Sequence, residues 1–255
     1  MKVVIVGSGN VATVLGKAFH KAGHEILQVI SKNIKHAKAL AIQFGSDSGN
    51  DITAANKEAD VYLFAINDNV LYHLHDNVHL GNKLVMHTAG SVSKDVLNNI
   101  SGNYGVLYPL LSLSKDYTNN PPIPFLIDGN TAETIGKIKA FAETISKDIS
   151  YATDEERVKY HISAVVVSNF ANHLYALAED FCASEHLDFS RLYPLINETT
   201  ARINKLPAKE VQTGPAVRED IYTLGKHLQL LTKQPDLKYI YLKLTESILK
   251  LHQLK

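Results

Sequence analysis

Two closely spaced glycines near the start of the sequence have the pattern of a phosphate-binding turn. Residues 7–12 fit G-x-G-x-x-A, with an apolar run over 3–6 before them and helical spacing over 11–21 after them. In such a turn the second glycine lets the backbone approach a pyrophosphate, which the helix N-terminus then binds. An ordinary strand–turn–helix is the alternative. The residues that we expect to hold the pyrophosphate are Gly7, Ser8, Gly9, Asn10, Val11 and Ala12.

The end of the second predicted strand indicates which dinucleotide binds. NAD-binding domains commonly place Asp or Glu there, to bind the ribose hydroxyls. This sequence has Ser31, Lys32 and Asn33 instead, a set that suits a 2′-phosphate. We therefore predict NADP as the cofactor, with NAD as the other possibility. The alternative for Lys32 is a solvated loop lysine.

Two further predicted strands end in residues that could border the nicotinamide. Ligands of such sheets bind at the carboxyl ends of the strands. We expect contacts from Ala65, Ile66 and Asn67 after the third run, and from His87 and Thr88 after the fourth. Polar residues at these positions could equally cap a helix or satisfy a turn.

The elements that position these residues alternate in type over the first half of the chain. Short apolar runs predict strands at 3–6, 25–30, 61–66, 84–87, 105–108, 125–127 and 149–151, and helical spacing predicts helices at 11–21, 34–44 and 131–145. Alternation of this kind is typical of a parallel sheet covered by helices. We expect an α/β fold with a doubly wound Rossmann domain over residues 1–153.

The second half is predicted to be helical only. Thr153 and Glu156 have the spacing of a capping box, so a long helix should begin there and run to about residue 183. Further helices are expected over 189–204, 215–231 and 236–251. We therefore predict an all-α C-terminal domain over residues 154–255. Its large apolar faces favour a homodimer, with an interface mainly within 189–251.

The long helix carries polar residues that could do chemistry. At ~100° per residue, His161, Ser168, Asn172, Tyr175 and Glu179 form one stripe on an otherwise apolar helix, which indicates burial in a cleft, against another subunit or in a structural network. His161, Asn169 and His173 are candidate proton or hydrogen-bond donors to a substrate. Arg218, expected in the first turn of a helix that begins near Pro215, is a candidate anchor for a substrate carboxylate.

Composition limits the remaining possibilities. The 255 residues carry 26 basic and 26 acidic side chains, and the one cysteine, Cys182, can form no intrachain disulfide. We expect no nucleic-acid partner and no membrane span, since no apolar run approaches the ~20 residues required; a cytoplasmic location is the prediction. His73, His75 and His79 are interpreted as surface histidines, and no metal site is predicted.

Several segments together resemble a known family. They are GSGNVA at 7–12, AINDN at 65–69, HTAGS at 87–91, YPLLSLS at 108–114, PFLIDG at 124–129, HISAVVVSNFANHL at 161–174 and QTGPAVRED at 212–220. The family joins a Rossmann-like NADP oxidoreductase domain, sometimes described as deazaflavin-dependent, to a C-terminal helical domain of unknown function. Pyrroline-carboxylate reductases, ketopantoate reductases and β-hydroxyacid dehydrogenases are wider relatives.

The resemblance implies hydride transfer between NADPH and a small carbonyl or imine substrate, with a pyrroline-carboxylate-reductase-like imine reductase as the narrower alternative. In the relatives, C-terminal helices pack across a dimer. One feature departs from the pattern of these relatives. β-Hydroxyacid dehydrogenases use a lysine on the long helix as general acid, and residues 161–182 of this sequence contain no lysine. That mechanism does not transfer, and a non-catalytic NADP-binding assembly module stays open.

Overall fold

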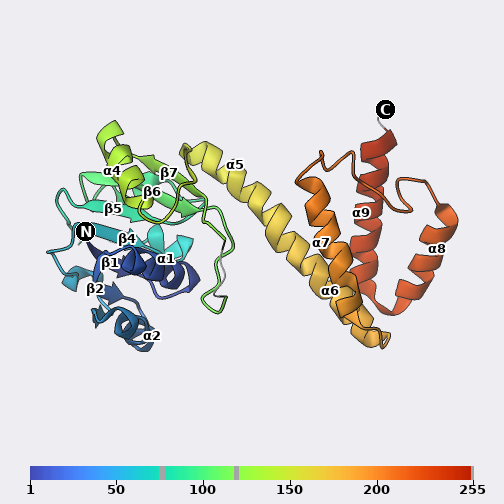
Figure 1. Cartoon of the computed structure of the whole chain (residues 1–255), viewed down its shortest axis with the longest axis horizontal. Helices are drawn as coiled ribbons and strands as arrows, with labels where there is room; N and C mark the ends of the chain where they lie inside the picture. The colour runs from blue at the N-terminus through green and yellow to red at the C-terminus, as the bar shows by residue number, and fades with distance from the viewer. Residues whose placement is uncertain (75–77, 118–120, 254–255) are drawn as a thin grey trace. The chain divides into compact units, whose positions relative to one another are not determined.

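The computed structural model describes residues 1–74, 78–117 and 121–253. The chain divides into two compact units, Met1–Ser168 and Asn169–Lys255 (Figure 1). The first unit holds the sheet, and the described part of the second contains helices only. The functional domain boundary at 153/154 stays a prediction.

An eight-stranded sheet forms the first unit. Its strands are β1 (Lys2–Val6), β2 (Glu25–Ile30), β3 (Asp47–Gly49), β4 (Val61–Phe64), β5 (Leu84–His87), β6 (Asn103–Pro109), β7 (Phe125–Gly129) and β8 (Ile149–Tyr151). The order is β3-β2-β1-β4-β5-β6-β7-β8, and Figure 1 shows β2, β1, β4, β5 and β6 in this sequence across the unit. The predicted Rossmann-type α/β fold is confirmed.

The predicted parallel sheet contains one antiparallel pair. Strands β6 and β7 are antiparallel, with Leu107 opposite Ile127, because the described part of the connection between them contains no crossover helix. The short strand β3 has the sequence Asp-Ser-Gly. It lacks an apolar run, so the pattern did not predict it.

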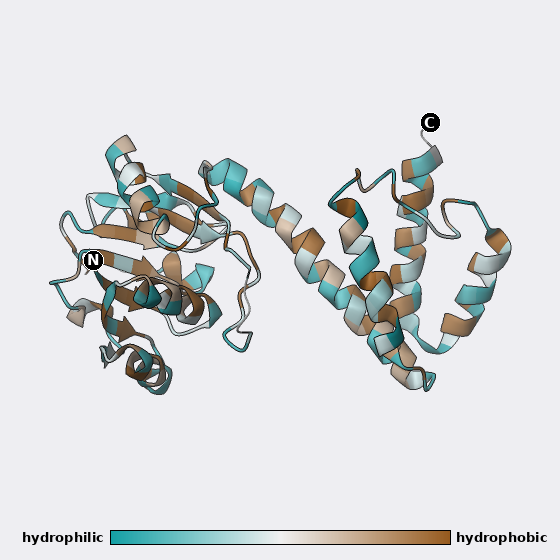
Figure 2. Cartoon of the chain, viewed as in Figure 1, coloured by the Kyte–Doolittle hydropathy of each residue, from teal (hydrophilic) through white to brown (hydrophobic). Residues whose placement is uncertain are grey.

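The core lies on both faces of the sheet. Along β1, Val3 and Ile5 point into one hydrophobic cluster and Val4 and Val6 into the other, as the alternation of side chains along a strand requires. The apolar colour of the strands in Figure 2 follows from this double burial. Three helices pack on the face of Val3 and Ile5: α1 (Asn10–Lys21), α2 (Ile34–Ala41) and α4 (Ala132–Ala142). The opposite face is covered by shorter elements, α3 (Asp68–Leu71) and the 3₁₀ turn Lys94–Leu97 among them.

The long helix begins where the capping box predicts. Helix α5 (Asp154–Ala164) has Thr153 as its N-cap, and the Glu156 side chain returns a hydrogen bond to the Thr153 backbone. A π-helical segment, Val165–Phe170, follows and leads into α6 (Ala171–Ser184). Because i→i+5 bonding adds a residue to the turn, positions beyond the π segment are rotated relative to those before it. The single polar stripe from His161 to Glu179, which assumes a regular helix, is therefore wrong.

Several apolar side chains of this long helix are exposed near the boundary between the two units. Val166, Val167 and Phe170 are 52%, 74% and 58% exposed. No described helix is long and apolar enough to cross a membrane.

The second unit packs α6 with three more helices, α7 (Tyr193–Ile203), α8 (Ile221–Leu230) and α9 (Pro235–Gln253). The helix expected from Pro215 begins instead at Ile221. Asp220 is a strong N-cap, since its carboxylate accepts hydrogen bonds from the backbone and hydroxyl of Thr223. Positive φ angles at Gly214 and Glu219 interrupt the chain just before it. Arg218 therefore lies in a turn, and its placement in the first turn of a helix is wrong.

Candidate functional site

The glycine turn between β1 and α1 has the geometry of a pyrophosphate cradle. Gly7 has φ +126°, and a Cβ there would lie 2.1 Å from the Ala65 carbonyl oxygen, so this position requires glycine. A Cβ on Gly9 would meet no atom within 4 Å. Gly9 is the N-cap of α1, and no described side chain caps that helix. The first N–H groups of α1 thus face open space above Gly9, where an anion fits.

A cavity of about 440 Å³ extends from this turn to the end of β2. It is lined by Val6, Gly7, Ser8, Gly9, Ile30, Ser31, Lys32, Asn50, Ile52, Ala65, Ile66, Asn67, Val70 and Leu74. The Ser8 hydroxyl donates a 2.8 Å hydrogen bond to that of Ser31, and Lys32 is exposed. Asn33 does not line the cavity, because its side chain caps α2 by accepting bonds from the Lys35 and His36 N–H groups.

A second cavity, of about 350 Å³, adjoins the first. The two share Gly9, Ala65, Ile66 and Asn67. The second is completed by Asn10, Val11, Asp68, Thr88, Ala89, Gly90, Tyr108 and His161. It therefore lies at the carboxyl ends of β1, β4, β5 and β6, where ligands of open α/β sheets bind. Ala12 is fully buried against the core and acts as the small packing residue of the turn.

Tyr108 and His161 meet at the wall of the second cavity. The Tyr108 hydroxyl lies 2.9 Å from Nδ1 of His161, and the rings make an edge contact with centroids 5.9 Å apart. A Cβ on Gly90 would lie 2.7 Å from the same Nδ1, so the absence of a side chain at Gly90 leaves room for the pair. Burial raises the pKa of Tyr108, which keeps the phenol protonated near neutral pH. The pair offers a proton beside the cavity.

The sequence around Tyr108 does not indicate a site residue. Tyr108 belongs to the segment YPLLSLS, which carries only the family resemblance. A tyrosine at a strand end carries no distinctive spacing. Its partner His161 lies 53 positions away along the chain, so only the pairing of β5 with β6 and the position of α5 bring the two together.

His87 has a different place from the one expected. It is fully buried and lines neither cavity. Its Nδ1 accepts a hydrogen bond from the Ala89 N–H, and its Nε2 lies 3.3 Å from the Ser93 carbonyl oxygen. Burial, together with the Arg157 cation, lowers the pKa of His87 to about 4. The neutral ring thus holds loop 88–93 in place, and its neighbour Thr88 reaches the cavity.

Three other predicted site residues lie in the second unit. Asn169 and His173 are exposed, and Arg218 is in the turn before α8. Their roles stay predictions. Within the described part of the chain no cluster of three His, Cys, Asp or Glu side chains could hold a metal ion; His75 lies outside the described residues.

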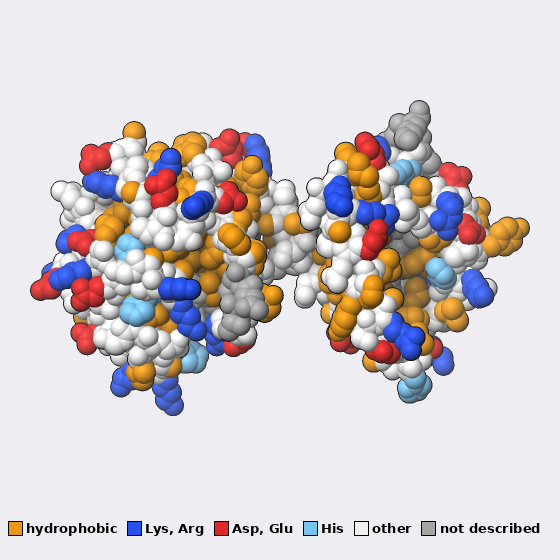
Figure 3. Space-filling model, viewed as in Figure 1, with side chains coloured by type: hydrophobic (Ala, Val, Ile, Leu, Met, Phe, Trp, Pro, Cys, Tyr) orange, Lys and Arg blue, Asp and Glu red, His pale blue; other side chains and the backbone are white. Residues whose placement is uncertain are grey.

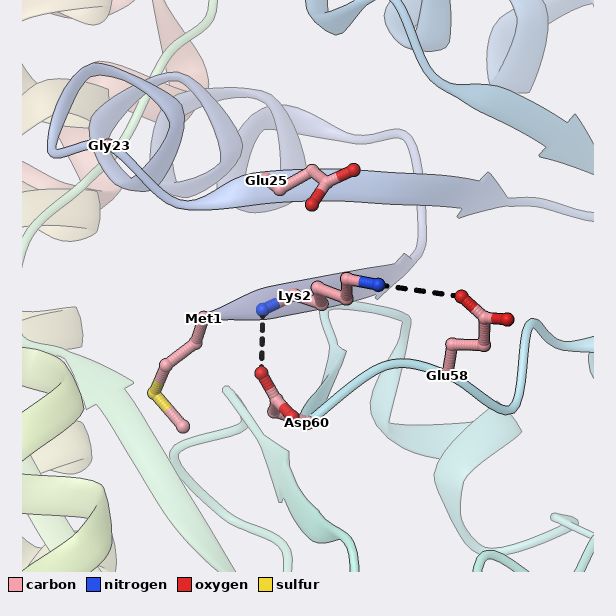
Figure 4. A pocket seen from close by; sticks show the side chains of 6 residues that line it. All are labelled: Met1, Lys2, Gly23, Glu25, Glu58 and Asp60. Carbon is pink, nitrogen blue, oxygen red and sulfur yellow. Dashed lines mark hydrogen bonds and ion pairs between the residues drawn. The ribbon is translucent and has the colours of Figure 1, made fainter.

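A third cavity lies at the amino ends of the strands, and its described residues include no pair like Tyr108 and His161 that could supply a proton. It is lined by Met1, Lys2, Gly23, Glu25, Glu58 and Asp60 (Figure 4). The Lys2 backbone N–H donates to Asp60 at 2.8 Å, and its ammonium pairs with Glu58 at 3.4 Å. These residues sit at the amino ends of β1, β2 and β4, away from the carboxyl ends of the strands, where such sheets bind ligands.

The first two cavities together fit a dinucleotide. The open space at Gly9 suits a pyrophosphate, Ser31 and Lys32 suit a 2′-phosphate, and Ile52, Val70 and Leu74 give the first cavity an apolar wall for an adenine ring. The second cavity lies on the far side of the shared residues and suits the nicotinamide with a small substrate.

Comparison with known proteins agrees with this geometry. Residues 2–89 match the family model "NADP oxidoreductase coenzyme F420-dependent", and residues 123–248 match "Domain of unknown function (DUF2520)". A Bacteroides fragilis protein, provisionally described as an NADP oxidoreductase, is 34% identical over 98% of both chains, with a TM-score of 0.92. The chain belongs to this NADP oxidoreductase family. The predicted resemblance and the NADP cofactor are thereby confirmed.

More distant structures share the fold of this chain. A reductive aminase from Aspergillus terreus, solved with NADPH, is 17% identical with a TM-score of 0.70, and covers 98% of this chain and 93% of its own. A 1-pyrroline-5-carboxylate reductase from Streptococcus pyogenes is 12% identical over 98% of both chains, with a TM-score of 0.62. No curated protein matches the chain.

Proposed function

We propose that the protein transfers a hydride between NADP(H) and a small carbonyl or imine substrate. The observation that carries the proposal is the Tyr108–His161 pair on the wall of a cavity continuous with the glycine cradle. When bound there, NADPH would supply the hydride. The chain's own residues would orient the substrate and supply the proton that a carbonyl oxygen or imine nitrogen must gain.

Reduction of an imine is the narrower form of this proposal. It is supported by the fold shared with a reductive aminase and a pyrroline-carboxylate reductase; fold likeness at this distance supports it by analogy alone. A non-catalytic NADP-binding module needs no proton donor beside the nicotinamide. The Tyr108–His161 pair therefore favours an enzyme.

An absorbance assay at the NADPH band tests the function. We would supply NADPH with keto acids, cyclic imines and an oxidised deazaflavin in separate reactions. Substrate-dependent loss of NADPH with one class is the expected result, and the class that reacts selects among carbonyl, imine and deazaflavin chemistry. NADPH binding without oxidation by any class would favour the non-catalytic module.

The cofactor preference gives a separate prediction. Lys32→Ala should weaken NADPH binding about tenfold and leave NADH binding unchanged, because only NADPH carries the 2′-phosphate that Lys32 would contact. Calorimetric titration of both cofactors measures the effect. Lys35→Ala is the matched control, since this exposed lysine on α2 lines neither cavity. Equal affinity of the wild type for NADPH and NADH would contradict the assignment.

We further propose a homodimer whose helical region is the main interface. Large apolar side chains are exposed on the second unit, where orange patches are visible in Figure 3. They include Leu195, Ile203, Leu206, Leu230, Tyr239, Leu242 and Leu244. Large apolar side chains exposed in such number support an interaction site on this unit. The partner's helical region would also bring polar groups to the open cavity, among them Arg218 from the turn before α8.

Light scattering at micromolar concentration should give twice the 28.2 kDa chain mass. Leu195→Asp should shift the mass toward one chain, because a buried unpaired charge opposes association. Ile42→Asp is the control, since Ile42 is an exposed apolar residue of the first unit, at 78%. A monomeric wild type, or dissociation by the control alone, would contradict the proposed interface.

A further inference from the structure

Arg157 is the largest fully buried side chain of the described chain, with no exposed surface. It lies on α5 one turn before His161. Its Nη2 donates to the Val92 carbonyl oxygen and, at 2.8 Å, to the Asp154 carboxylate. Its Nε and Nη1 have no hydrogen-bond partner among the described residues. A buried guanidinium with unpaired donors is costly, and such a group in a folded protein calls for an explanation.

The surroundings hold this cation firmly in place. Asp154 accepts a 2.5 Å hydrogen bond from the Ser93 hydroxyl and longer ones from the Lys94 N–H. Burial would raise the pKa of Asp154, but the hydrogen bonds from Ser93 and Arg157 outweigh it and lower the pKa. The first turn of α5 is thus bonded to loop 92–94, immediately after the cavity-lining residues Thr88 and Gly90.

Arg157 and His161 lie four residues apart on α5 and so on the same face of this helix, and the Tyr108 hydroxyl lies 2.9 Å from Nδ1 of His161, which brings the buried cation near the phenol. Burial raises the pKa of Tyr108, the Arg157 guanidinium opposes the rise, and the Asp68 carboxylate adds to it. His161 is the hydrogen-bond partner of the phenol. A fixed positive charge stabilises an anion that forms nearby. Arg157 therefore favours the charged form of the Tyr108 phenol, a phenolate.

We propose that Tyr108 is the proton donor of the reaction and that Arg157 is a positioning residue that stabilises the phenolate left behind. This inference rests on the proposed function. As the substrate carbon gains the hydride, its oxygen or nitrogen takes the Tyr108 hydroxyl proton. The phenolate then recovers a proton from Nδ1 of His161, and this partly exposed ring takes its replacement from solvent. Protons and charge balance over the cycle.

Two substitutions separate this assignment from a histidine donor. With 2-methyl-1-pyrroline and cyclohexanone as probes and saturating NADPH, Tyr108→Phe should lower kcat by about 100-fold or more. His161→Gln should lower kcat by only about tenfold, because solvent can still reprotonate Tyr108, although more slowly than His161 does. NADPH affinity should stay within about twofold of the wild type in both, since neither group is required for cofactor binding. A larger loss in His161→Gln than in Tyr108→Phe would overturn the assignment.

A titration without substrate tests the role of Arg157. The ¹³Cζ resonance of Tyr108, assigned by its loss in Tyr108→Phe, reports ionisation of the phenol. Arg157→Gln should raise its midpoint by about one pH unit or more, and Arg157→Lys, which keeps the charge but displaces it, should raise it by a smaller, measurable amount. An unchanged midpoint in a folded Arg157→Gln variant would overturn the role of Arg157. If that variant does not fold, the smaller charge displacement in Arg157→Lys must still move the midpoint, and a midpoint identical to wild type would count against the role.

The two failures are distinguishable. If the wild type binds NADPH but oxidises it with neither probe, the proposed function and the donor role fail together for these substrate classes. The titration still decides whether Arg157 acts on Tyr108, because it requires neither cofactor nor substrate.

Discussion

A valine in place of Gly9 should weaken NADPH binding about 100-fold in a protein that still folds. The Gly9 backbone, at φ −81°, is one that any residue adopts, and a Cβ meets nothing within 4 Å. The space it would fill is that of the pyrophosphate. Loss of one or two hydrogen bonds to a charged group, at ~1.5–3 kcal/mol each, gives the expected factor. Calorimetric titration measures it, and thermal unfolding should show a cost of only about 1 kcal/mol for the poorer N-cap.

Gly7→Ala is the informative contrast. Its Cβ would collide with the Ala65 carbonyl oxygen at 2.1 Å, and φ +126° strains any other residue. We expect this variant to lose stability, whereas Gly9→Val loses binding. NADPH affinity in Gly9→Val within about threefold of the wild type would show that the pyrophosphate lies elsewhere.

Gly90→Ala should lower turnover by about 100-fold with little change in NADPH affinity. The added methyl would lie 2.7 Å from Nδ1 and 2.9 Å from Cγ of His161, and 3.0 Å from the Tyr108 ring. The His161 side chain must then rotate away from Tyr108, and the Tyr108 ring, which carries the proposed proton donor, must shift as well, so the loss exceeds that of His161→Gln. Displacement of a catalytic group by about 1 Å can lower the reaction rate by about 100-fold. Steady-state kinetics with the probe that the wild type reduces measures the effect.

Gly136→Ala provides the matched control, because a Cβ at this position on α4 meets no atom within 4 Å. It should keep wild-type turnover and stability, or gain slightly in stability, since alanine favours a helix over glycine. Wild-type turnover in Gly90→Ala would contradict the assignment of chemistry to the Tyr108–His161 pair.

Features that depend on neighbouring residues could be predicted from the sequence. The turn at Gly7 and Gly9 is defined by an adjacent strand and helix, and the start of α5 by the reciprocal bonds of Thr153 and Glu156. Both are local interactions, so spacing alone indicates them.

Features that depend on distant contacts could not be predicted. Tyr108 and Arg157 are placed at the site by contacts between distant parts of the chain. These are the pairing of β6 with β5 and the hydrogen bonds from α5 to residues 92–94. His87 has the position of a site residue at a strand end, but both nitrogens of its ring pair with backbone groups of the loop that follows. The π segment at Val165–Phe170 contains no glycine or proline that would indicate an irregular helix. It nevertheless changes which residues share a helix face.

A crystal structure of the protein with NADP⁺ would locate the cofactor relative to the Tyr108–His161 pair. We expect the pyrophosphate against Gly9 at the first turn of α1 and the 2′-phosphate beside Ser31 and Lys32. The nicotinamide ring should lie in the cavity lined by Thr88, Tyr108 and His161, at ~3–3.5 Å from a bound substrate analogue. A nicotinamide outside that cavity, with the Tyr108 hydroxyl remote from it, would contradict the account.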